Sequence, residues 1–241
     1  LIVAESGRYQ PYPTDFGASL EPPKNLCVTS LCDDFSDLSS AWEPHLSPDI
    51  GRVTGGGHAV PSEPLCVRWG ALRIRSGPYL YANIRRPFGI DNCSVQVQFR
   101  RPGNYIISQW KPVQFGEGMG PALALRWNDG REIRVTCSGQ GGEEVFTCVG
   151  TNADGSRGFR KGGPKLGFIN YFRVELHADS LSFWGSADGE DWQQIHRVSR
   201  AGFMGAPDTL LLGQGADIDV NRTAYDDDVY YDTLVVARLE E

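Results

Sequence analysis

The stretch YFRVELHADSLSFWGSADGEDW, residues 171–192, carries the clearest strand signals of this chain. Phe172, Val174 and Leu176 alternate with polar residues, which is the period-2 pattern of a strand with one buried face. The alternation resumes after a short polar break, with Leu181 and Phe183 on the apolar side. An Asp-Gly pair then predicts a tight turn and a third strand. A meander with one apolar side must be covered by a second layer, so we expect a two-layer protein.

The rest of the chain carries similar signals. Its 29 glycines and 15 prolines indicate many turns, and no long stretch has the helical period of 3.6 residues. Short strand-like runs lie at residues 66–69, 71–75, 79–85, 93–101, 105–110, 122–127, 131–137, 144–149, 209–213 and 229–239. The Gly/Arg/Lys-rich segment 150–165 is expected to be a loop. Many short strands at this spacing predict an all-β, two-sheet antiparallel jelly-roll β-sandwich, which we assign to residues 27–241.

Three segments carry a family resemblance. The hairpin RVEL…SLSFWGSADGEDWQQI, the closing YYDTLVVARL and the opening DDFSDLSSAWEP resemble the concanavalin A-like lectin/glucanase (LamG-like) jelly rolls. The resemblance covers residues 33–239 and implies the same sandwich. That superfamily includes lectin-like modules, glycosidases, polysaccharide lyases and structural domains, so the resemblance implies a fold and leaves the function open.

Residues 1–26 differ from the rest of the chain. Their apolar and aromatic residues are interleaved with prolines and follow neither strand nor helix periodicity, which is typical of an extended arm. A Pro-rich arm is ordered only where something holds it, either its own sandwich or the sheet edge of a neighbouring copy. The sequence leaves both possibilities open. The predicted contact residues of this assembly arm are Leu1, Ile2, Val3, Tyr9, Tyr12 and Phe16.

Charge and hydropathy exclude two classes of partner. The net charge is −7 and the isoelectric point is about 5.2. A nucleic-acid partner requires a basic face that neutralises phosphates, so we expect none. No apolar run approaches the ~20 residues of a membrane span.

The cysteine content predicts disulfide bonds. Six cysteines form an even set without zinc-type CxxC pairs, and six allow 15 pairings. A cross-strand bond between Cys137 and Cys148 is expected, because they flank a Gly-rich turn between two strands. Cys27 and Cys32 are placed to close a small loop, which leaves Cys66 with Cys93.

Two sequons, at Asn92 and Asn221, are candidate N-glycosylation sites. Asn221 is the better candidate because it lies in a polar segment. Together with the cysteines, the sequons predict an extracellular or cell-surface location. The chain begins at Leu1 rather than Met, as expected of a processed mature form.

Acidic residues gather near both ends of the predicted sandwich, which meet in space in a jelly roll. Members of the resembled superfamily often hold a structural calcium with such residues, so the resemblance implies Asp34 and Asp232 as candidate ligands. A solvated acidic loop is the alternative interpretation.

Exposed aromatic side chains are candidates for stacking on sugar rings. We name Trp184, Trp127 and Trp110, although most tryptophans of such a domain are expected in the core. Trp184 lies on the other face of its strand from Leu181 and Phe183, which makes it the best exposed candidate.

No catalytic residue is assigned. Glucanases of the resembled superfamily place their carboxylates on one strand as Glu-x-Asp-x-x-Glu, and that motif is absent. Gln194-Ile195-His196 resembles the Gln-Ile-His of jelly-roll alginate lyases, and its spacing predicts Gln194 and His196 on one strand face. Tyr171-Phe172-Arg173 is similar to their Tyr-Phe-Lys, but their Arg-Thr-Glu motif is missing.

Three functions follow, in order of preference. The leading prediction is a non-enzymatic, secreted structural subunit, disulfide-bonded and N-glycosylated, that assembles with copies of itself through the arm into a filament or surface layer. The alternative is a carbohydrate-binding, lectin-like module with a polysaccharide partner. The third is a polysaccharide lyase.

Overall fold

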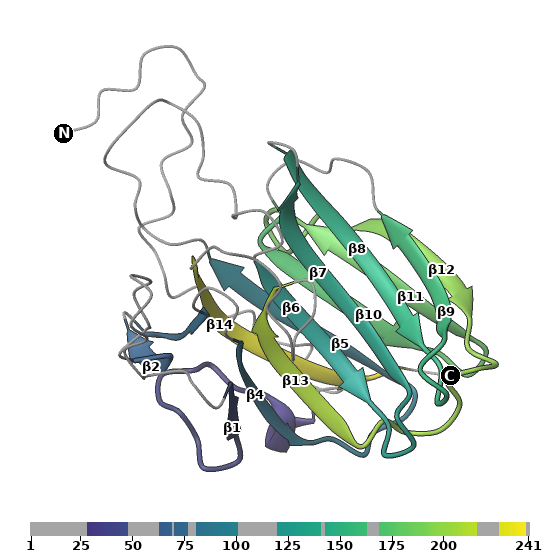
Figure 1. Cartoon of the computed structure of the whole chain (residues 1–241), viewed down its shortest axis with the longest axis horizontal. Helices are drawn as coiled ribbons and strands as arrows, with labels where there is room; N and C mark the ends of the chain where they lie inside the picture. Colours follow the sequence, from purple (N-terminus) through teal and green to yellow (C-terminus); the bar gives the residue numbers. More distant parts are fainter. Residues whose placement is uncertain are drawn as a thin grey trace.

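The computed structural model describes residues 28–47, 63–68, 70–76, 81–100, 120–140, 143–162, 169–215 and 227–239. Their strands form two seven-stranded antiparallel sheets, here named A and B, which lie one behind the other (Figure 1). Sheet A has the order β12 (Gln193–Ser199), β11 (Ser180–Ser186), β10 (Tyr171–Leu176), β5 (Cys93–Arg100), β14 (Asp227–Arg238), β3 (Ala71–Ser76) and β2 (Leu65–Arg68). Sheet B has the order β1 (Glu43–Leu46), β4 (Ala82–Pro87), β13 (Thr209–Gln214), β6 (Pro121–Arg126), β7 (Glu132–Gln140), β8 (Glu143–Thr151) and β9 (Arg157–Gly162). A 3-10 turn, η1 (Thr29–Leu31), precedes them. The predicted all-β sandwich is confirmed.

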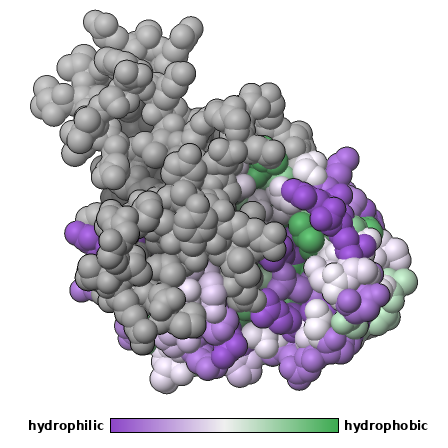
Figure 2. Space-filling view, viewed as in Figure 1, coloured by the Kyte–Doolittle hydropathy of each residue, from purple (hydrophilic) through white to green (hydrophobic). Residues whose placement is uncertain are grey.

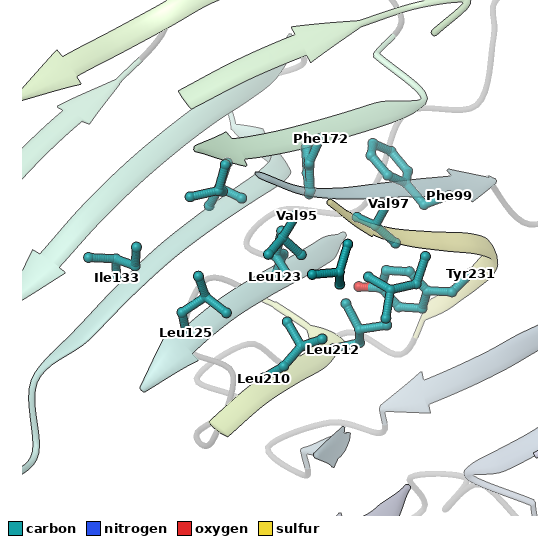
Figure 3. Packing of buried hydrophobic residues seen from close by; sticks show 14 of the residues in the cluster. Val95, Val97, Phe99, Leu123, Leu125, Ile133, Phe172, Leu210, Leu212 and Tyr231 are labelled. Atoms are coloured by element: carbon teal, nitrogen blue, oxygen red, sulfur yellow. The ribbon is translucent and has the colours of Figure 1, made fainter. Parts of the chain in front are cut away.

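One hydrophobic core fills the space between the sheets. Apolar side chains on alternate positions of each strand point into this layer, as Figure 3 shows for residues of β5, β6, β10 and β13. Each such buried side chain stabilises the fold by roughly 1.5–3 kcal/mol relative to an exposed one. The labelled aliphatic residues include Val95, Val97, Leu123, Leu125, Leu210 and Leu212, all exposed by 1% or less.

Tyr231 of β14 connects the two sheets through its hydroxyl group. The hydroxyl accepts a hydrogen bond from the backbone N–H of Ala122 at 2.9 Å and lies within donating distance of the Gly213 carbonyl. Both partners belong to sheet B, whereas Tyr231 belongs to sheet A. Complete burial raises the pKa of Tyr231, so the hydroxyl stays protonated and keeps both roles.

The predicted meander of residues 171–199 forms three adjacent strands of sheet A, with Val174 opposite Phe183 in the register. The turn between β11 and β12 is held by Asp188, whose carboxylate accepts hydrogen bonds from the backbone N–H groups of Glu190 and Asp191, both at 2.9 Å. These bonds hold the pKa of Asp188 below its usual value. Gly189 supplies the positive φ, +85°, that this turn requires.

Strand β9 corrects the prediction that residues 150–165 are a loop. Most of its side chains are exposed, so the segment lacks the alternation that marks a strand in sequence. Its apolar contact is Phe159, which lies opposite Gly150 and packs against Phe183 and Phe203. A Cβ atom at Gly150 would lie 2.2 Å from the Phe159 ring, so this ring requires glycine beneath it.

The predicted disulfides are not formed in the described part of the chain. In the register of β7 and β8, Cys137 lies opposite Phe146 and Cys148 lies opposite Val135. The two cysteines are therefore diagonal neighbours, roughly 7–8 Å apart, which exceeds the reach of a disulfide. Both side chains are buried in the core instead.

The second predicted pair is separated still further. Strands β2 and β5, which carry Cys66 and Cys93, have β3 and β14 between them, a separation of about 14 Å. Burial raises the pKa of the Cys93 thiol to about 12. Cys32 lies against β14, where its sulfur accepts a hydrogen bond from the Val236 N–H at 3.5 Å. Cys27 lies outside the described residues.

The surface of the described part is largely hydrophilic in the view of Figure 2. Met204, with 51% exposure, is the large hydrophobic side chain that stands out among the described residues. None of the helical segments in the described ranges has the length and apolar character that crossing a membrane requires. The predicted assembly arm, residues 1–26, lies outside the described residues.

Candidate functional site

The outer face of sheet A presents a row of polar and aromatic side chains. The strand register aligns Gln194 of β12 with Trp184 of β11, Arg173 of β10 and Gln96 of β5. These side chains point away from the core, because their neighbours Phe172, Val174 and Phe183 fill it. Three strand spacings separate the first from the last residue, so the row is about 14 Å long.

Trp184 and Trp192 flank the guanidinium group of Arg173. The guanidinium carbon lies 4.2 Å from the ring centre of Trp192 and 5.3 Å from that of Trp184. Trp192 comes from the turn before β12, and its indole N–H donates to the Gly189 carbonyl at 2.9 Å. Two cation–π contacts at these distances fix the long arginine side chain on the sheet surface.

Glu175 holds the polar groups of this cluster together. Its Oε2 accepts a hydrogen bond from the Trp184 indole N–H at 2.9 Å and lies 3.1 Å from the His177 Nε2. Its Oε1 forms an ion pair with the Arg173 Nε at 3.2 Å. We name Arg173, Glu175, His177, Trp184 and Trp192 the tryptophan–arginine platform.

The platform is partly open to solvent. The side chains of Arg173 and His177 are 24% and 36% exposed. Burial lowers the pKa of Arg173 from its usual value, and the charge of Glu175 opposes that shift. The closest atoms of the ion pair between Arg173 and Glu175 are Nε and Oε1, and Nε is buried without a hydrogen-bond partner among the described residues.

The outer face of sheet B has a different construction. Glu132 of β7 is 9% exposed, and its two oxygens accept hydrogen bonds from Arg126 Nε and Arg134 Nη1, both at 3.0 Å. Two and four residues beyond Glu132 on this face come Arg134 and Thr136, so the strand offers no second carboxylate at these positions. At the centre of the face, Ala122, Ala124 and Leu211 are buried in a small apolar cluster.

The other tryptophan candidates do not join the platform. Trp127 is 4% exposed, donates its indole N–H to the Gly205 carbonyl at 3.1 Å and packs against Phe203. It is a core residue with Arg131 stacked on its ring, which contradicts its predicted role in sugar stacking. Trp110 lies outside the described residues.

The resemblance to alginate-lyase motifs fails on geometry. The register shifts between Phe183 and Trp184, so Gln194 pairs with Trp184 but His196 pairs with Phe183. Gln194 therefore faces outward, whereas His196 turns inward and stacks on Phe183. The prediction that both side chains share one face is wrong, because a β-bulge at Ile195 reverses the alternation.

The two predicted calcium ligands, Asp34 and Asp232, form other contacts in the structure. Asp232 is 5% exposed and forms an ion pair with Arg100. Burial raises its pKa, Arg100 opposes this shift, and the charge of Asp34 adds to it. Asp34 accepts a hydrogen bond from the Ser36 N–H at 3.0 Å. Among the described residues no group of three or more His, Cys, Asp or Glu side chains is arranged to hold a metal ion.

Of the two sequons, only Asn92 lies in the described part. It occupies a turn with φ +47° before β5, and its side-chain amide donates to the Leu239 carbonyl at 3.4 Å. Asn221 lies outside the described residues. Glycosylation and an extracellular location stay predictions.

Comparison with solved structures identifies the fold. No family model and no curated protein sequence matches the chain. A β-1,3-1,4-glucanase (lichenase) from a mouse hindgut metagenome has a TM-score of 0.59 at 9% identity, covering 86% of this chain and 98% of its own. The β-glucanase of Bacillus licheniformis has a TM-score of 0.56 at 9% identity, with 87% and 97% covered. The transglycosylase Crh5, without its ligand, has a TM-score of 0.52 at 14% identity, with 87% and 84% covered. The chain has the concanavalin A-like jelly-roll fold.

These neighbours contradict the leading functional prediction. The three solved structures named above are two glucanases and a transglycosylase, which act on carbohydrates. The prediction of a non-enzymatic structural subunit that self-assembles through its arm is therefore wrong. The alternatives that involve carbohydrates are retained. Contact between copies through the arm has no support in the described residues.

Of the platform residues, Trp184 is the one that the sequence predicts as a binding residue, and Arg173 enters the prediction only through its lyase-like motif. Trp184 is predicted because it follows Phe183 directly and therefore lies on the other, polar face of the strand. Arg173, Glu175 and His177 alternate on the polar side of the decisive stretch, but alternation alone does not distinguish a site from a solvated face. The useful signal is the pairing of Arg173 with Trp184 across the hairpin, which depends on a register that the sequence does not specify.

Proposed function

We propose that this chain is a carbohydrate-binding protein that holds a saccharide on the outer face of sheet A, with Trp184 as the principal contact. The observation that carries the proposal is a partly exposed tryptophan held in one orientation on a polar sheet surface. Its indole N–H donates a hydrogen bond to Glu175, and the guanidinium group of Arg173 lies against its ring. An aromatic side chain fixed in this way loses little conformational entropy when a ligand binds.

The surroundings of Trp184 suit a polyhydroxylated ligand. Gln194 and Gln96 lie at the two ends of the row that contains it, and each amide has both donor and acceptor groups. The indole supplies apolar surface for the C–H face of a sugar ring, while the amides are placed to bond hydroxyl groups at its rim.

Binding is favoured over hydrolysis by the state of the carboxylates. Glycoside hydrolysis by paired carboxylates requires an acid and a base or nucleophile on opposite sides of one bond. Glu132 is neutralised by Arg126 and Arg134, and its neighbours on the same strand face are not acidic. Glu175 is engaged by Trp184, Arg173 and His177. Neither group is arranged to transfer protons to a substrate.

The test is retention on immobilised polysaccharides. We expect Trp184→Ala to lower affinity for the retained polysaccharide at least tenfold, the size of effect typical of a central aromatic contact. Met204→Ala is the control, because it removes an exposed apolar side chain from the loop after β12. Circular dichroism should show both variants folded.

Two outcomes would overturn the proposal. The first is equal retention of Trp184→Ala and the unaltered protein. The second is release of new reducing ends or unsaturated products from the polysaccharide, which would make the chain an enzyme.

A further inference from the structure

Arg173 is the charged group of the platform whose hydrogen-bonding capacity is least used. Its guanidinium has five N–H donors, and its closest approach to Glu175 is the 3.2 Å between Nε and Oε1. The rings of Trp184 and Trp192 cover the group at 5.3 Å and 4.2 Å and keep it from swinging into solvent. Because Nε is buried and lies next to Glu175, we take the edge with the two terminal amino groups as the one that a ligand would meet.

We propose that this platform selects acidic saccharides, with the guanidinium of Arg173 pairing with the carboxylate of a uronic acid whose ring lies beside Trp184. The inference rests on the proposed carbohydrate-binding function and adds a ligand class to it. A carboxylate matches the planar fork of a guanidinium and forms two parallel hydrogen bonds with it, which a neutral hydroxymethyl group cannot do.

The position of Glu175 agrees with this assignment. Its carboxylate occupies the Nε side of Arg173 and also accepts the Trp184 indole N–H. A ligand carboxylate is therefore directed to the opposite, outer edge of the guanidinium. Because Glu175 partly neutralises Arg173, the free platform is stable without a bound anion.

The overall charge of the protein determines which probe is suitable. A protein with a net charge of −7 repels a long polyanion. Weak retention on an acidic polymer could then result from this repulsion even if the platform binds uronates. Short oligosaccharides at moderate ionic strength avoid this problem. Suitable probes are tetrasaccharides of galacturonate, glucuronate and mannuronate, each paired with the neutral tetrasaccharide obtained by reducing its carboxyl groups.

The experiment is calorimetric titration of the intact chain with each pair of probes. We expect at least one acidic tetrasaccharide to bind about tenfold or more tightly than its neutral counterpart, and Arg173→Gln to abolish this preference. Arg173→Lys keeps the charge without the fork and should retain part of it. Arg157→Gln, which removes a charge from an exposed position of β9 in sheet B, is the control and should change neither affinity.

The outcomes separate this inference from the function on which it rests. If neutral tetrasaccharides bind as well as the acidic ones, and lose affinity in Trp184→Ala, the platform binds sugars but does not select uronates. If no probe binds, both proposals fail. If Arg173→Gln weakens acidic and neutral ligands equally, Arg173 only positions Trp184, and the inference is overturned.

Discussion

The outer faces of the two sheets both carry a glutamate beside arginines, but they use it differently. On sheet B, Glu132 bridges Arg126 and Arg134 and is 9% exposed, next to a buried cluster of small apolar residues. On sheet A, Glu175 contacts one edge of Arg173, and two tryptophans hold that arginine at the surface. The first arrangement satisfies its charges internally. The second leaves an arginine that is 24% exposed and paired with a single carboxylate.

In this fold, stability and ligand recognition are assigned to different sheet faces. A carboxylate enclosed by two guanidinium groups contributes to stability and offers little to a ligand. An arginine held against two aromatic rings is already ordered before a ligand binds. We therefore expect mutations on sheet B to change the free energy of unfolding and mutations on sheet A to change ligand affinity.

Removal of the Glu132 carboxylate should have the largest effect. Glu132→Ala takes away the group between Arg126 and Arg134, and we expect a loss of about 2–3 kcal/mol in the free energy of unfolding. This lies below the range for a fully buried ion pair because the Arg126 side chain is 31% exposed. Urea unfolding followed by fluorescence measures it.

Glu132→Gln is the matched control, since it keeps an acceptor without the charge, and it should lose less stability. Polysaccharide retention of both folded variants should equal that of the unaltered protein. If Glu132→Ala stayed as stable as the parent but lost retention, the binding face would be sheet B, and the comparison of the two faces would be reversed.

The matching change on sheet A should act on affinity. Glu175→Gln removes the charge that opposes Arg173 but keeps an oxygen for the Trp184 indole N–H. We expect stability to change by less than about 1 kcal/mol, as for partly exposed ion pairs. The affinity for an acidic tetrasaccharide should rise about two- to fivefold, since the full charge of Arg173 becomes available. A fall in affinity would mean that Glu175 itself binds the ligand.

The sequence predicts the sandwich well because alternation reports directly on burial. The meander of residues 171–199 and the long strand β5 were expected from apolar residues at every second position, and the closing strand β14 from a strand-like run and the family resemblance. Strand β9 was missed because an edge strand with one apolar contact, Phe159, carries almost no alternation.

Cross-strand register limits what the sequence can predict about sites. Cys137 and Cys148 were expected to pair because they flank a turn, yet a two-residue offset separates them. Gln194 and His196 were expected on one face until a bulge reversed the second. Since a shift of one residue moves a side chain to the other face, motif spacing along one strand cannot locate a site that spans several strands.

His196 lies where the edges of the two sheets meet, and it offers the smallest of these tests. Its ring stacks on Phe183 of sheet A and lies 5.7 Å from Phe159 of sheet B, and its pKa is lowered by burial and then by Lys161. Since the folded state holds this proton less tightly than the unfolded chain, its contribution to stability is present above about pH 6.5 and is lost as the pH falls. We expect the melting temperature of the unaltered protein to fall slightly more between pH 7 and pH 5 than that of His196→Gln, by less than about 2 °C. An equal fall in both proteins would show that protonation of His196 does not change the stability of the fold.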